Sequence, residues 1–133
     1  GRLLAGAMAV AFADVPRPTA LVPVPLARAR LRQRGYDQAL ELARPLARAL
    51  GLSLVPEGLR RIRDTQAQSR LDAIGRRRNV RGAFAPGPGA DLPGHVALVD
   101  DVMTTGATLQ AAAMALRRAG VERVDAWVCA RVA

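Results

Sequence analysis

The segment VALVDDVMTTGATL, residues 96–109, limits what this chain can fold into more than any other feature of its sequence. Four apolar residues lead to two adjacent carboxylates, Asp100 and Asp101, which precede hydroxyl and glycine residues and then a helical pattern. This order predicts a strand over residues 95–99, a turn that carries the acids, and a helix. A helix N-terminus presents unpaired amides and partial positive charge, so a phosphate is favoured there. The segment therefore predicts a sugar-phosphate site, with an ordinary polar-capped turn as the alternative.

Apolar periodicity along the chain alternates between the helical and the extended kind. We expect helices over residues 3–12, 38–50 and 107–119, and strands over 20–24, 53–55, 59–62, 82–85, 95–99 and 123–131. Strands that alternate with helices predict an α/β fold with a mostly parallel central sheet flanked by helices. Ligands of such folds bind at the carboxyl ends of the strands, where the acids and threonines of residues 96–109 lie.

The composition excludes several kinds of site. All 20 residues of the Lys+Arg count are arginine, which excludes a P-loop and a lysine Schiff base. The one histidine, His95, and the one cysteine, Cys129, are too few for a Cys/His zinc site, and a Ser-His-Asp triad would depend on His95 alone. Cys129 lies in an alternating apolar stretch, so we expect it to pack as a small core residue. A single thiol forms no intrachain disulfide, which is compatible with the reducing cytoplasm, where we expect this protein.

The length and the first residues bear on domain organisation. The 133 residues, half of them apolar, predict a single domain over residues 1–133. We expect no insertion into a membrane, because no apolar stretch is long enough to span one. The opening GRLLAGAMAVAFAD has the apolar run and Ala-x-Ala arrangement of a secretion signal. We favour a short helix packed on the sheet instead, because Arg2 is the only positive charge ahead of that run.

The positive charge of the chain is unevenly distributed. The formal net charge is +9, and 14 of the 20 arginines fall between Arg28 and Arg81. A basic cluster of this kind predicts anionic partners, among them nucleic acid and phosphorylated small molecules. Tyr36 is the only aromatic residue in that region, so a platform for stacking bases of single-stranded DNA is poorly supplied. Candidate DNA contacts are Arg32, Arg76, Arg77, Arg78 and Arg81.

Residues 96–109 resemble the motif with which type I phosphoribosyltransferases bind phosphoribosyl diphosphate (PRPP). The resemblance implies a type I phosphoribosyltransferase-like fold in which Asp100 and Asp101 bind the ribose 2′- and 3′-hydroxyls. It also implies that Mg²⁺ binds through PRPP near these two acids, with no direct protein ligand. The 5′-phosphate loop would consist of Met103, Thr104, Thr105, Gly106, Ala107 and Thr108.

Three further segments, residues 22–51, 59–71 and 76–84, together resemble the competence protein F (ComF) family, phosphoribosyltransferase-like proteins linked to bacterial DNA uptake. The resemblance implies that residues 26–34 form a diphosphate loop and that residues 63–81 form a flap over the substrate. The diphosphate loop would bind through Leu26, Ala27, Arg28, Arg30 and Arg34. The flap residues nearest the site would be Arg63, Thr65, Gln66 and Gln68. Family members usually begin with a four-cysteine zinc module, which this sequence lacks.

Two functions follow from these observations. The first is a transferase that moves a 5-phosphoribosyl group from PRPP to an unidentified nitrogen nucleophile, with Mg²⁺ and with no evident general base. The second is a non-catalytic competence factor that binds single-stranded DNA through the arginine-rich face. Contacts with the competence machinery and a homodimer are compatible with either function. A dinucleotide-binding or phosphatase-like domain is excluded, because the sequence has neither G-x-G-x-x-G after a strand nor an Asp-x-Asp pattern.

Overall fold

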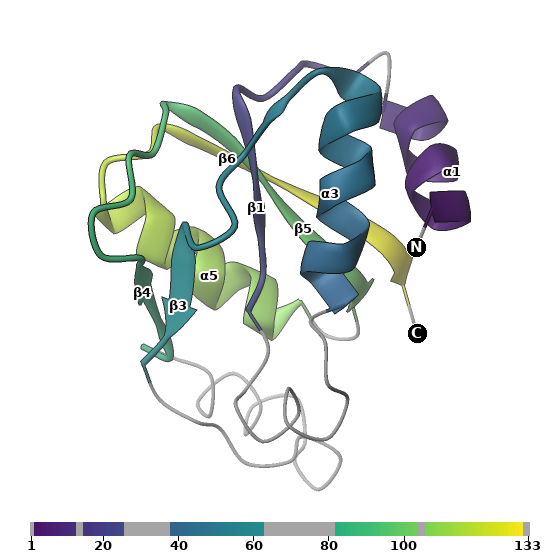
Figure 1. Cartoon of the computed structure of the whole chain (residues 1–133). Helices are drawn as coiled ribbons and strands as arrows, with labels where there is room; N and C mark the ends of the chain where they lie inside the picture. Colours follow the sequence, from purple (N-terminus) through teal and green to yellow (C-terminus); the bar gives the residue numbers. More distant parts are fainter. Residues whose placement is uncertain (1, 13–14, 26–37, 63–81, 104–105, 132–133) are drawn as a thin grey trace, which may run out of the picture.

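A parallel sheet forms the centre of the molecule in the computed structural model, which describes residues 2–12, 15–25, 38–62, 82–103 and 106–131 (Figure 1). Its strand order is β2-β1-β5-β6, and every neighbouring pair is parallel. A separate antiparallel pair consists of β3 and β4. The strands are β1 (Ala20–Pro23), β2 (Ser53–Leu54), β3 (Leu59–Arg61), β4 (Phe84–Pro86), β5 (His95–Met103) and β6 (Arg123–Arg131). The predicted α/β class and the mostly parallel sheet are confirmed.

The two central strands, β1 and β5, are apolar without alternation because both faces of the sheet are covered. All four residues of β1 are buried, and residues 96–99 of β5 are 0% exposed. Val96 and Leu98 belong to the hydrophobic cluster on one face, whereas Ala97 and Val99 belong to the cluster on the other face. Burial on two faces is what a continuous apolar run in a parallel strand indicates.

Helices α1 (Arg2–Phe12) and α3 (Gln38–Leu50) cover one face of the sheet (Figure 1). The buried residues of α3 recur at helical spacing and pack on β1 and β5; they are Ala39, Leu42, Ala43, Leu46 and Ala47. Helix α1 packs beside α3, and the Phe12 ring stacks on the Trp127 indole with their centroids 4.5 Å apart. The prediction that residues 3–12 form a packed helix is therefore confirmed.

Helix α5 (Ala107–Arg118) and the β3–β4 pair cover the other face. The helix buries an apolar stripe against that face and ends before Gly120, whose φ of 103° suits glycine. In the part of the chain that the structure describes, none of the helices is long and apolar enough to cross a membrane.

The order of the strands places a topological switch point between β1 and β5, and we call this position the crevice, after the ligand-binding crevices of such sheets. The chain leaves β1 through α3 toward the β2 edge, but it leaves β5 through α5 toward the β6 edge. Because α3 and α5 lie on opposite faces, the two connections diverge from the carboxyl ends of β1 and β5 (Figure 1). A divergence of this kind is the point at which α/β sheets bind ligands.

Strand β5 corrects one prediction about the acids. The sequence predicts that the strand ends at Val99 and that Asp100 and Asp101 lie in the turn after it, but β5 continues to Met103. The reason is the equally long β6, which pairs with β5 from His95 to Met103 and supplies hydrogen-bond partners beyond the apolar run. Both acids therefore lie within the strand.

Candidate functional site: a crevice at the carboxyl ends of β1 and β5

The pairing of β1 with β5 ends at Pro23, whereas β5 continues to Met103. The last β1–β5 pair is Pro23 with Val99, and the final ladder bond runs from the Val24 amide to the Val99 carbonyl at 3.0 Å. Asp100 is the next residue of β5, and it is paired with β6 through Val128. The acid therefore lies just beyond the end of β1, at the edge of the sheet where the space beside β5 is no longer occupied by β1.

The partly buried side chain of Asp100 lies on the α5 face of the sheet. Side chains alternate along a strand, so Asp100 shares a face with Leu98, which packs in the cluster beside α5. Its cross-strand partner, Val128, packs against the same cluster. The carboxylate is thus on the side of the sheet from which α5 begins. The side chains of Asp101 and Met103 and all of Thr104 and Thr105 lie outside the described residues.

The N-terminus of α5 suits an anion. Its N-cap is Gly106, with φ 80° and ψ 0°, so no side-chain oxygen of the cap occupies the amides of the first turn. The first turn contains no acidic residue, whereas the last turn carries Arg117 and Arg118. This charge distribution favours a negative ligand at the positive end of the helix dipole. Ala107 is buried and Thr108 is partly buried at this end of the helix.

A second feature of this edge is a contact that the sequence did not predict. The Arg61 Nε atom donates a hydrogen bond to the Pro25 carbonyl at 3.0 Å, and the guanidinium carbon lies 4.8 Å from the centroid of the Phe84 ring. Arg61 ends β3, and Pro25 follows β1 by two residues. The only sequence signal for Arg61 is its position just before the predicted flap, and this position does not distinguish it from the other arginines of that region.

The remaining predicted site residues fall outside the described part of the chain. These are Leu26, Ala27, Arg28, Arg30 and Arg34 of the diphosphate loop, Arg63, Thr65, Gln66 and Gln68 of the flap, and the DNA candidates Arg32, Arg76, Arg77, Arg78 and Arg81. The described flanks of the predicted flap are joined to each other, because the Ile62 amide donates to the Ala83 carbonyl at 2.8 Å. These residues' roles stay predictions.

The single histidine lies at the opposite end of the sheet. His95 begins β5, and its Nε2 atom lies 2.7 Å from Asp125 Oδ2 on β6. The Arg123 Nε atom donates to the other oxygen of Asp125 at 3.1 Å. Partial burial alone would raise the pKa of Asp125, but the hydrogen bonds and positive charges of His95 and Arg123 lower this pKa below its ordinary value. His95 therefore has a structural partner at the amino ends of the strands and is remote from the crevice.

Cys129 agrees with its prediction. It is a partly buried free thiol on β6, packed against the cluster that contains Trp127. Among the residues that the structure describes, no three His, Cys, Asp or Glu side chains come together as a metal-binding group.

The sequence of this chain is similar to a family model and to several known proteins. The family model for the phosphoribosyl transferase domain matches residues 37–133. Competence protein F of Haemophilus influenzae is 38% identical over 138 residues, which cover 98% of this chain and 60% of that protein. DNA utilization protein YhgH of Salmonella typhi is 37% identical over 127 residues, which cover 93% of this chain and 54% of that protein. YhgH of Escherichia coli (strain K12) is 38% identical over 117 residues, covering 86% of this chain and 50% of that protein. The chain thus spans between 50% and 60% of the length of these relatives.

Proposed function

This chain belongs to the phosphoribosyl transferase family, in the group of competence protein F, and from that membership we propose that its crevice binds PRPP. In this proposal Asp100 and Asp101 accept hydrogen bonds from the two ribose hydroxyls. The 5′-phosphate binds at the N-terminus of α5, and the diphosphate binds at the loop after β1. The observation that carries the proposal is the position of Asp100, one residue beyond the last β1–β5 pair and on the face from which α5 begins.

The reaction that we propose is the transfer of the 5-phosphoribosyl group to a nitrogen nucleophile. The bond between C1′ and the diphosphate oxygen breaks, and the diphosphate leaves with the electron pair. The nitrogen lone pair forms the new bond to C1′, and the nitrogen then loses a proton to solvent. Backbone amides and arginines that fix the phosphoryl groups would supply catalysis mainly by positioning and by stabilising the leaving charge.

We propose Mg²⁺ as the metal that accompanies PRPP. Phosphate and hydroxyl oxygens are ligands that Mg²⁺ prefers, so the metal would bind through those of PRPP near Asp100 and Asp101, without a direct protein ligand. When bound, the metal would neutralise part of the charge of the departing diphosphate.

Calorimetric titration with PRPP and Mg²⁺ tests the binding proposal. We expect wild-type protein to bind, and the double variant Asp100→Asn, Asp101→Asn to bind about a hundredfold or more weakly, since a hydrogen bond to a charged group contributes roughly 1.5–3 kcal/mol. Asp91→Asn removes one carboxylate charge from an exposed loop residue and serves as the control. A double variant that binds PRPP like wild-type protein would show that the ribose binds elsewhere.

A second candidate function is binding of single-stranded DNA, because three of the relatives described above are named for competence or DNA utilization. The exposed arginines Arg44 and Arg48 belong to the basic region between Arg28 and Arg81. Titration with a single-stranded oligonucleotide over a salt series tests this function. Phosphate contacts predict a steep fall in affinity with salt, and a flat dependence would contradict them. With either function, we also propose partners in the competence machinery, a homodimer and a cytoplasmic location.

A further inference from the structure

The proposed diphosphate loop and flap are separated along the chain, but one hydrogen bond joins the residues that lead into them. Pro25 directly precedes residues 26–34, and Arg61 lies two residues before Arg63. The bond from Arg61 Nε to the Pro25 carbonyl spans 36 residues of sequence and is 3.0 Å long. A single side chain therefore connects the exit from β1 to the base of the β3–β4 pair.

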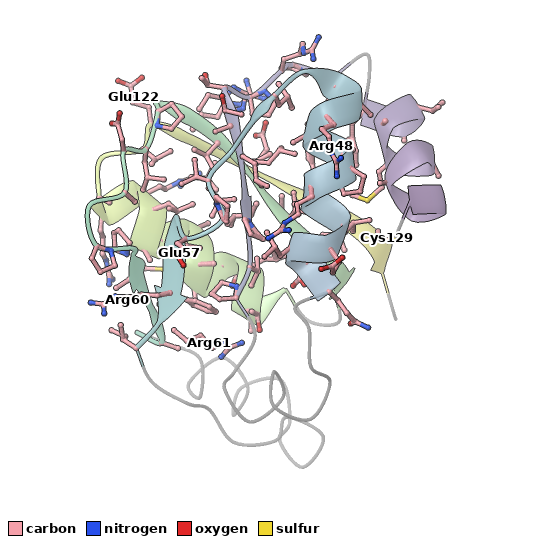
Figure 2. The ribbon with its side chains drawn as sticks, viewed as in Figure 1. Arg48, Glu57, Arg60, Arg61, Glu122 and Cys129 are labelled. Atoms are coloured by element: carbon pink, nitrogen blue, oxygen red, sulfur yellow. The ribbon has the colours of Figure 1, made fainter. Side chains whose placement is uncertain are left out.

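The side chain of Arg61 is held in place by its surroundings. Arg61 pairs with Phe84 across β3 and β4, and its guanidinium lies over that ring. Leu59 and Arg61 share one face of β3, where Leu59 is buried, whereas Arg60 is exposed on the other face. Figure 2 shows Arg60 and Arg61 extending in different directions from β3. Ring contact and partial burial restrict the guanidinium, so the direction of its Nε–H bond is fixed.

The carbonyl that accepts this bond lies where the chain leaves the β1–β5 ladder. The preceding residue, Val24, is still anchored by its amide to the Val99 carbonyl at 3.0 Å. Pro25 has no amide hydrogen, so its carbonyl is its only strong backbone hydrogen-bonding group. The bond from Arg61 thus adds one more fixed point after the β1–β5 ladder, immediately before the chain enters the proposed diphosphate loop.

We propose that Arg61 is a positioning residue for the diphosphate half of the crevice. It acts through Pro25 and Phe84: it fixes the direction in which the chain leaves β1 and holds that exit at the base of the proposed flap. This role rests on the proposed binding of PRPP. A loop whose entrance is not fixed samples more conformations, and a ligand must then restrict them at a cost in affinity.

Two ligands test the two halves of the crevice separately. Ribose 5-phosphate offers the ribose and the 5′-phosphate alone, whereas PRPP also offers the diphosphate. We expect Arg61→Met, which keeps the length and the apolar stem, to bind PRPP about tenfold more weakly, the effect of one lost hydrogen bond. Its affinity for ribose 5-phosphate should stay within about twofold of wild type. Arg60→Met removes the same charge from the neighbouring exposed position and should change neither affinity.

Both titrations are run calorimetrically with Mg²⁺, and the thermal unfolding of each variant is recorded to show that it is folded. The possible results then distinguish failure of the positioning role from failure of the proposed function. An Arg61→Met protein that binds PRPP like wild type, or that is folded and loses both ligands equally, overturns the positioning role. Wild-type protein that binds neither ligand overturns the proposed function, and the positioning role with it. If Arg61→Met does not fold, Phe84→Leu replaces it, because this change removes the ring that orients Arg61. An unchanged ratio of the two affinities in Phe84→Leu then refutes the role.

Discussion

Replacement of Gly106 by alanine tests whether the start of α5 is the phosphate site. Gly106 has φ 80° and ψ 0°, a left-handed conformation that costs a residue with a Cβ about 1–2 kcal/mol. For a domain of this size, that loss lowers the melting temperature by about 4–8 °C. The backbone relieves part of this strain by rotating at residue 106, so the amides of the first helical turn change direction and lose contact with the phosphate. Each charge-assisted hydrogen bond contributes roughly 1.5–3 kcal/mol, so affinity for ribose 5-phosphate should fall at least about tenfold.

Gly120 provides a matched control at the other end of the same helix. Its φ is 103°, and a Cβ there would meet nothing within 4 Å. Gly120→Ala should therefore cost similar stability without any loss of affinity. Thermal unfolding and calorimetric titration with ribose 5-phosphate on both variants give the comparison. If Gly106→Ala is destabilised yet binds ribose 5-phosphate as tightly as Gly120→Ala, then the start of α5 is not where the phosphate binds.

Two further predictions concern stability. Phe12→Ala should lower the free energy of unfolding by about 2 kcal/mol, which is less than the loss expected for a fully buried phenylalanine. It should also shift the fluorescence emission of Trp127, the only tryptophan, to longer wavelength, because the stacked ring is lost. Val10→Ala, at a position that is 80% exposed, should change neither the stability nor the emission. In the folded protein the pKa of Asp125 is lowered from its ordinary 3.8, so in acid the unfolded chain binds more protons than the folded one. The stability that Asp125 contributes is therefore present above about pH 4 and is lost as the pH falls through the folded pKa. Urea unfolding across this range should therefore show a smaller acid loss for Asp125→Asn, and parallel curves for the two proteins would contradict the role of the His95 contact.

The pattern of single residues determined most of the secondary structure. The strand predicted over residues 123–131 is β6 (Arg123–Arg131), and the helix predicted over residues 107–119 is α5 (Ala107–Arg118), which ends before Gly120. These elements follow from apolar spacing and from glycine at a helix end, and both signals are local in the chain. The same local reading identified Asp100 and the start of α5 as neighbours in sequence, and the structure places them at one edge of the sheet.

Only the tertiary structure decided where the acids lie and what surrounds them. Strand β5 extends past Val99 because β6 continues beside it, whereas the pairing of β5 with β1 stops there. The hydrogen bond from Arg61 to Pro25 likewise joins residues that are 36 positions apart. Strand pairing and long-range contacts depend on partners that are distant in the chain, so the local periodicity of a segment does not predict them. The sequence determined which residues we predict to bind a phosphorylated sugar, and the pairing of the strands placed Asp100 and the start of α5 at the same end of the sheet.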